Sequence, residues 1–282
     1  MASKFYNKKA IITGSHIEFY NHEKPISYGH TCKVKGGRKL GKSGITPRSK
    51  EYRDRRNKEA RNDLIRLINI NFSGQNYDPI KFITLTFRDG SIPDLTDTKR
   101  ANKELKKYLR KLRNHYNKLK YISVIEFQDE NNRGAIHFHL IAKFPVVPVS
   151  REKAIEWINE GKLSNDYNIK NNHYEWWGNG SVTIKAIKEA KKYKETSTSI
   201  STSNIGQYVA AYMTKNLDDQ RLQGVKAYSP SQGLKKPVVL YEEEAEKAIE
   251  GLEKENVVYA NSYIDKYHNT QVNYTKFHSL KG

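Results

Sequence analysis

The sequence predicts an α+β fold, in which a central antiparallel β-sheet is flanked by helices. Short segments rich in β-branched and aromatic residues indicate strands, and longer segments with apolar residues every three or four positions indicate amphipathic helices. These segments follow in the order βα, ββ, α, β, α. Two strands come directly after one another, which favours an antiparallel sheet over a doubly wound parallel one.

A helix and a strand open this series. The hydroxyl of Ser49 can cap the amides of the following turn, so we expect a helix to begin there. Its apolar stripe consists of Leu64, Ile65, Leu67 and Ile68. The segment KFITLTF, from Lys81 to Phe87, alternates in side-chain type and predicts a strand with both faces at least partly buried.

Residues 97–119 predict the next helix, after a turn at Asp89 and Gly90. Its apolar residues recur at helical spacing with Lys and Arg between them, at Leu105, Leu109, Leu112 and Tyr116. Residues 121–128 and 135–144 predict the two strands of a hairpin, joined by a polar turn. We expect the later elements to be a helix at 150–160, a WWGNG turn, a strand at 181–187, a linker at 196–203, a helix at 204–217 and an acidic helix from about 242.

The charge of the chain points to an acidic polymer as its partner. Lys and Arg number 50 against 31 Asp and Glu, which gives a formal net charge of +19. Basic residues are densest between Lys33 and Arg61. The DNA-contacting candidates there are Arg38, Lys39, Lys42, Arg48, Arg53 and Arg56. The alternative interpretation of this segment is a solvated charged face that binds nothing.

Several classes of protein are disfavoured. The single Cys32 excludes an internal disulfide framework and a Cys-based zinc finger, and it fits a reducing compartment. No apolar run approaches the roughly 20 residues that cross a bilayer, and the N-terminus does not resemble a signal peptide, so we expect an intracellular protein without a membrane partner. Residues 36–43, GGRKLGKS, match a phosphate-loop pattern but follow no apolar strand, so we expect no bound nucleotide.

Two histidines and a glutamate form a candidate metal site. His137 and His139 are separated by one residue in a predicted strand, so both imidazoles point to the same face. Glu126 lies on the preceding strand at the same general level if the two strands pair antiparallel. Two imidazoles and a carboxylate leave positions open on a divalent ion such as Mn²⁺ or Mg²⁺. The alternative is a pair of ordinary surface or core histidines.

Two tyrosines form a candidate nucleophile pair. Tyr208, Tyr212 and Lys215 are spaced by four and three residues in the predicted helix 204–217, which places them on one face. Burial of such tyrosines in an amphipathic helix is the alternative. A phenol with a pKa near 10 is a poor nucleophile at neutral pH, but a metal-bound phosphate, a nearby ammonium and exclusion of water make its attack feasible.

Three motifs together resemble the HUH single-strand DNA endonucleases. They are FITLTF at 82–87, HFH at 137–139 with an upstream acidic residue at Glu126, and YVAAYMTK at 208–215, in that order along the chain. The set is similar in particular to the two-tyrosine rolling-circle replication initiators of small bacteriophages and plasmids. The resemblance implies the HUH fold, with Mn²⁺ or Mg²⁺ held by Glu126, His137 and His139.

The resemblance also implies an activity. A tyrosine would attack the scissile phosphate of origin DNA, leaving a 5′-phosphotyrosyl enzyme and a 3′-OH primer, and the second tyrosine would allow rejoining by strand transfer. Tyr212 is favoured as the first nucleophile because it stands in a Tyr-x-x-Lys arrangement, with Lys215 offsetting charge. The implied partners are single-stranded or hairpin origin DNA and a host helicase and polymerase, in the cytoplasm of a bacterial host cell.

The same reasoning divides the chain into three parts. We expect a basic DNA-binding region with a helix over 1–75, the nicking and joining nuclease over 76–240, and an acidic helix with a polar tail of unassigned role over 241–282. Two other functions remain open: a two-tyrosine HUH transposase or mobilisation relaxase, and a non-catalytic single-stranded nucleic-acid-binding protein. A covalent protein–DNA adduct separates the last of these from the others.

Overall fold

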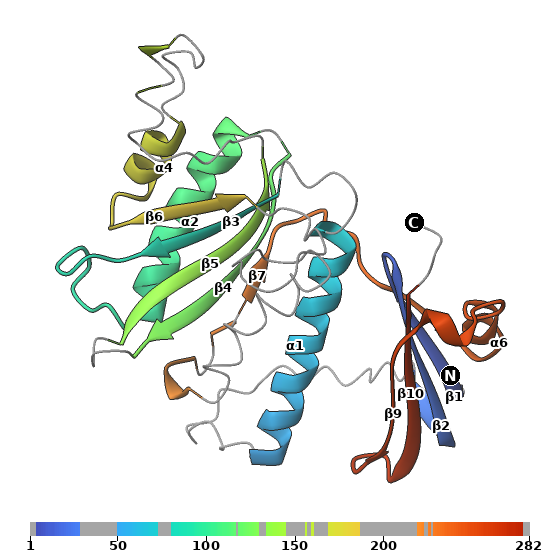
Figure 1. Cartoon of the computed structure of the whole chain (residues 1–282). Coiled ribbons are helices and arrows are strands. Elements are labelled where there is room, and N and C mark those ends of the chain that lie inside the picture. The colour runs from blue at the N-terminus through green and yellow to red at the C-terminus, as the bar shows by residue number, and fades with distance from the viewer. Residues whose placement is uncertain are drawn as a thin grey trace. The chain divides into compact units, whose positions relative to one another are not determined.

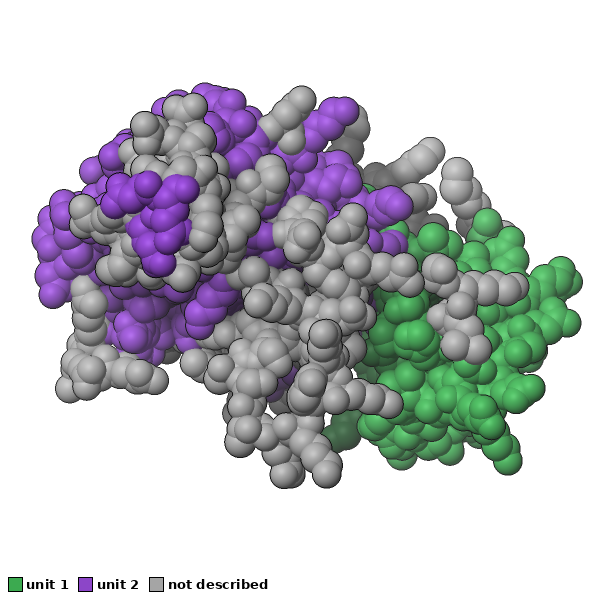
Figure 2. All heavy atoms as spheres, turned by 45° about the horizontal axis from the view of Figure 1, so that its top comes forward, with its two compact units in different colours: residues 1–49, 236–282 green, residues 50–235 purple. Residues whose placement is uncertain are grey.

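The computed structural model describes residues 4–28, 50–72, 80–116, 118–129, 134–144, 156, 159–160, 169–186, 219–222, 225–226 and 228–278. The chain forms two compact units, which are coloured separately in Figure 2. Residues 1–49 and 236–282 make up the terminal unit, and residues 50–235 make up the central unit. The predicted α+β class is confirmed. The described residues contain two five-stranded antiparallel sheets, one in each unit, where the sequence predicted one.

The central unit contains most of the elements that the sequence predicted (Figure 1). Its elements are α1 (Lys50–Phe72), β3 (Ile80–Thr86), α2 (Thr98–His115), β4 (Lys120–Gln128), β5 (Ala135–Lys143), α4 (Ile169–Trp177), β6 (Val182–Ala186), the 3₁₀ turn η3 (Gln220–Leu222) and β7 (Tyr228–Pro230). The strand order is β6-β3-β5-β4-β7. The predicted helix 204–217, and most of the one at 150–160, lie outside the described residues.

The two faces of the central sheet are covered by different helices. On one face, Ile83, Leu85 and Phe138 pack with the apolar stripe of α2 and with Trp177 of α4, and Figure 1 shows α2 behind the strands. On the other face, Leu64, Ile68 and Phe72 of α1 pack on an apolar cluster contributed by β3, β4 and β5: Ile80, Phe82, Ile122, Val124 and Ile141. The strands are therefore buried on both sides, as the apolar content of KFITLTF indicates.

A buried histidine joins α2 to α4. His173 is fully buried, with Nδ1 2.7 Å from the hydroxyl of Tyr108 and Nε2 3.3 Å from that of Tyr116. Burial lowers the pKa of His173 to about 4 and raises the pKa of Tyr108 well above its usual value. The imidazole is neutral at pH 7, so it can accept one of these hydrogen bonds and donate or share the other.

A glycine lets the WWGNG turn press against the end of β3. The indole Nε1 of Trp177 donates to the carbonyl of Thr86 at 3.0 Å, and the amide of Arg88 donates to the carbonyl of Asn179 at 2.8 Å. At Gly180 a Cβ atom would lie 2.1 Å from the Thr86 oxygen. Only glycine fits this contact, which fixes the end of the strand that lies beside β5.

The terminal unit is built from both ends of the chain. Its elements are β1 (Lys4–Thr13), β2 (His16–Tyr28), β8 (Val238–Tyr241), α6 (Glu242–Lys247), the 3₁₀ turn η4 (Lys254–Asn256), β9 (Val257–Asp265) and β10 (Thr270–His278). The strand order is β8-β1-β2-β10-β9. The four strands outside β8 were not foreseen from the sequence, and the predicted acidic helix is shorter than expected, ending before Gly251, whose φ is +76°.

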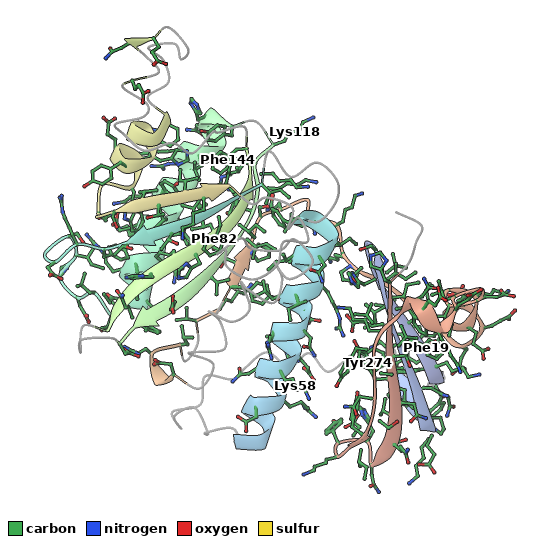
Figure 3. The ribbon with its side chains drawn as sticks, viewed as in Figure 1. Phe19, Lys58, Phe82, Lys118, Phe144 and Tyr274 are labelled. Atoms are coloured by element: carbon green, nitrogen blue, oxygen red, sulfur yellow. The ribbon has the colours of Figure 1, made fainter. Side chains whose placement is uncertain are left out.

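One face of the terminal sheet is covered and the other carries aromatic rings. Ala245 of α6 packs on Ala10 and Ile17, with Phe19 and Phe277 beside them. Figure 3 shows Phe19 on the side of α6 and Tyr274 on the opposite side of the sheet. None of the described helices is long and apolar enough to cross a membrane.

Candidate functional site

The strand register brings the predicted metal-binding residues to one face of the central sheet. β4 and β5 pair antiparallel, and Glu126 stands directly opposite His137, as the sequence predicted. His139 stands opposite Val124 on one side and opposite Thr84 of β3 on the other. Phe138, between the two histidines, packs in the cluster on the α2 face. The histidines therefore lie on the face that α1 partly covers.

Three neighbours fix the ring of His139. Its Nε2 lies 2.5 Å from Oε2 of Glu126, and both side chains are buried, at 4% and 8% exposure. Its Nδ1 lies 3.2 Å from the Thr84 hydroxyl, and the Phe82 ring stacks on it with centroids 5.5 Å apart. These contacts set the orientation of the imidazole and tie its protonation to that of the carboxylate, as supporting residues do in metal sites.

His137 completes the donor set without joining this hydrogen-bonded pair. It is half-buried, and its ring centroid lies 6.5 Å from that of His139. Among the residues that the structure describes, no three His, Cys, Asp or Glu side chains are arranged as a metal cluster. Two imidazoles and one carboxylate on the same face are nevertheless donors of the kind that Mn²⁺ accepts, with positions left for oxygen ligands.

The predicted nucleophiles and most predicted DNA contacts are outside the described residues. This holds for Tyr208, Tyr212 and Lys215, and for Arg38, Lys39, Lys42 and Arg48. Arg53 lies in the first turn of α1. Arg56 is exposed on the same helix and its Nη1 lies 2.7 Å from a carboxylate oxygen of Glu59, so its charge is partly offset.

Sequence reasoning missed an arginine that fixes the segment after the predicted nucleophile helix. Arg221 in η3 makes two hydrogen bonds of 2.9 Å to the carboxylate of Asp129, next to the end of β4, and also binds Asp219. Its guanidinium lies over the Phe127 ring, 3.9 Å from the centroid. Hydrogen bonds to Asp219 and Asp129 raise the pKa of Arg221, and the bond from Arg221 lowers the pKa of Asp219. Nothing in the sequence pattern singles out this pairing, because its members are far apart in the chain.

Sequence reasoning also passed over a second basic surface, on α2. The exposed residues of this helix include a series of cations: Lys99, Arg100, Lys103, Lys106, Lys107, Arg110, Lys111 and Arg113. The signal was present, since Lys and Arg separate the apolar positions of the stripe. α2 covers the face opposite the histidines, so this surface is separate from the site.

Comparison with known families adds an independent observation. Residues 80–217 match the model of a family described as replication-associated protein ORF2. The matched segment is just under half of the chain and runs from β3 through the predicted nucleophile helix, so it includes Glu126, His137 and His139. This similarity supports a role in the initiation of replication. No curated protein and no solved structure matches the chain.

Proposed function

We propose that this protein is a rolling-circle replication initiator that nicks single-stranded origin DNA through a tyrosine and rejoins it by strand transfer. The observation that carries the proposal is the pairing of Glu126 with His137 and His139 on one sheet face, inside the segment that is similar to the replication-associated family. An ordinary structural pair of histidines would not require a buried carboxylate against one of them.

Glu126, His137 and His139 would hold the divalent ion. The Nε2 atom of His139 and the Oε2 atom of Glu126 now share a proton, and an ion in that position would replace it. When bound, Mn²⁺ or Mg²⁺ acts as a Lewis acid on the scissile phosphate and orients it. Thr84 and Phe82 keep the His139 ring in place for this role, through the hydroxyl contact and the ring stack.

The tether at Arg221 supports a nucleophile close to this site. Arg221 joins Asp219 to Asp129, and Asp129 is only three residues after Glu126. Tyr212 precedes Asp219 by seven residues, so the chain limits their separation to about 24 Å when extended and about 10 Å when helical. The tether therefore keeps Tyr212 and Tyr208 in the neighbourhood of the histidines.

The proposed reaction conserves its atoms. The phenol oxygen of Tyr212 attacks the phosphorus and loses its proton to solvent, and the bond from phosphorus to the 3′ oxygen breaks. The 3′ oxygen takes a proton and becomes the primer end, while the 5′ phosphate stays on the tyrosine. Lys215 offsets the negative charge that develops. In the second step Tyr208 attacks the regenerated origin, and the released 3′-OH displaces Tyr212 to close a circle.

Covalent adduct formation tests the proposal. The full chain is incubated with single-stranded DNA from its own replicon and Mn²⁺, and a denaturing gel shows whether a shifted band forms. We expect an adduct that EDTA abolishes and that is lost in the Tyr208→Phe/Tyr212→Phe double variant. The exposed Tyr174 of α4 provides the control, since Tyr174→Phe should leave the adduct unchanged. No adduct with any origin-containing strand would leave only a nucleic-acid-binding protein.

A further inference from the structure

A continuous row of aromatic rings crosses the terminal sheet on the face opposite α6. The rings belong to side chains that the strand register places on this face, and successive neighbours are in contact. In order, the row consists of Tyr28, Tyr241, Tyr6, His22, Tyr20, Tyr274 and Tyr259, with centroid separations of 4.3, 4.8, 5.5, 6.4, 4.9 and 6.0 Å. We call this surface the aromatic face. It draws on all five strands of the sheet.

The aromatic face is open where a core would be closed. Its floor is buried, with Ile11 at 3% and Val272 at 0% exposure, while Tyr259 and Tyr263 on β9 are 53% and 41% exposed. In the part of the chain that the structure describes, nine of the ten exposed large apolar or aromatic residues belong to the terminal unit. An exposed set of this kind marks a binding surface more often than it occurs by chance.

The charges of the terminal unit are separated between its two faces. Seven carboxylates lie in residues 242–255, the segment that begins with α6 and packs on the opposite face through Ala245, Ile249 and Leu252. On the aromatic face, the ammonium of Lys9 lies 5.9 Å from the Tyr20 ring centroid, and Lys276 stands opposite Glu18. A polyanion is therefore repelled from the α6 side and attracted to the side with the rings.

The rings themselves are suited to nucleobases. Burial lowers the pKa of His22, so this imidazole is neutral at pH 7, like the tyrosines beside it. Neutral flat rings accept any base by stacking, and lysines between them meet the phosphates. Five strands at about 4.8 Å give a row about 19 Å long, which matches about five nucleotides at the stacked spacing of about 3.4 Å.

We propose that the aromatic face is a second DNA-binding surface, which holds single-stranded DNA by stacking its bases on Tyr20, Tyr274 and Tyr259. The choice of DNA rests on the proposed function, whereas the stacking rests on the terminal unit alone. This surface does not discriminate between sequences, because every base has a face to stack. Its role is to hold the strand that the nuclease displaces or is about to cut.

Base stacking is tested by comparing two oligonucleotides of equal charge. A labelled 15-mer of thymidines and an abasic 15-mer are titrated with the full chain in EDTA, and anisotropy reports binding. The wild-type protein should bind the thymidine strand about tenfold or more tightly than the abasic strand. In Tyr259→Ala/Tyr274→Ala this preference should disappear. Because both rings are at least partly exposed, the variant should keep its melting temperature, which is measured alongside.

Matched controls separate base stacking from self-association of the chain. Ile264→Ala changes a 68% exposed residue of β9 whose side chain points to the opposite face, and it should keep the preference for bases. The proposal is wrong if the tyrosine variant retains the wild-type ratio. It is also wrong if the variant changes only the sedimentation mass, because the rings would then contact a second copy of this chain. The assay needs neither metal nor nicking, so failure of the cleavage experiment does not affect it.

Discussion

The two units contain sheets of the same size but use their surfaces differently. In the central unit, α1 and α2 cover both faces, and polar groups such as Glu126 and His139 are enclosed among apolar side chains. In the terminal unit, α6 covers one face and aromatic rings stand open on the other. An enclosed polar group can be oriented to a fraction of an ångström, which chemistry requires. An open aromatic face tolerates many ligand positions, which suits binding without sequence preference.

This difference predicts how each unit responds to substitution. A change at one enclosed atom of the central unit should abolish activity, because the hydrogen bonds around it have no substitute. Removal of one ring from the terminal unit should weaken binding only in part, because the neighbouring rings remain in contact with one another. The following predictions test this contrast, starting with the largest effect.

Replacement of Glu126 by Gln should lower the rate of adduct formation on the order of a thousandfold. Gln preserves the size of the side chain and can still hydrogen-bond His139, but it removes the charge that a divalent ion requires. The rate is measured with Mn²⁺ on a denaturing gel. The control is Glu104→Gln on α2, a carboxylate of similar burial that pairs with Lys107 at 3.0 Å. Equal rates in the two variants would contradict a metal role for Glu126.

Replacement of Gly180 by Ala should destabilise the central unit by about 4 kcal/mol. The new Cβ would lie 2.1 Å from the carbonyl oxygen of Thr86, so the turn must move and release the contacts of Trp177 and Asn179. Gly90→Ala is the control, because its Cβ meets nothing within 4 Å and only its φ of +74° costs about 1 kcal/mol. Chemical denaturation measures both, and equal losses would argue against the contact at Gly180.

Stability should fall as the pH is lowered from about 6.5 to about 4. His173 has a folded-state pKa of about 4 and an unfolded value near 6.5, so between these limits the unfolded chain binds more protons than the folded chain. The loss is about 3 kcal/mol, from 2.5 units at about 1.4 kcal/mol each. It is read from the free energy of unfolding at a series of pH values. His173→Phe should flatten this dependence while lowering stability at pH 7.

The terminal unit offers a comparison for this titration. The pKa of His16 is also lowered to about 4, first by burial and then by the nearby Lys276, but its ring is half-buried whereas His173 is fully buried. Solvent screening reduces the contribution of a partly exposed group. His16→Phe should therefore remove less of the pH dependence than His173→Phe. The opposite order would show that the terminal sheet, and not the α2–α4 contact, controls acid stability.

The sequence predicted the central unit well because its signals are local. The alternation in KFITLTF, the helical spacing of Leu105, Leu109 and Leu112, and the polar turn after Gln128 each lie within one element. The opposition of Glu126 and His137 followed from the hairpin, since a short turn fixes the register of two neighbouring strands.

The terminal unit was not predictable in the same way. β2 pairs with β10, so His22 meets Val272 across most of the chain, and no local pattern indicates such a partner. The tail also reads as polar because every residue of β9 before Asp265 is exposed, which removes the alternation that identifies a half-buried strand. Arg221 and Asp129 escaped notice for the same reason, since contacts between distant residues leave no spacing to recognise.

Replacement of Arg221 by Ala should reduce adduct formation about tenfold and leave binding of single-stranded DNA unchanged. Without the guanidinium, Asp219 and Asp129 repel each other, and the chain that leads back to Tyr212 is no longer fixed to the end of β4. The effect is smaller than that of Glu126→Gln because positioning is loosened while the metal donors stay in place. Single-turnover gels and anisotropy measure the two properties. Lys8→Ala is the matched control, as it removes the exposed ion pair with Glu246 in the terminal unit and should change neither. If Arg221→Ala weakened DNA binding as much as cleavage, this arginine would contact the strand directly and the tether would not explain its effect.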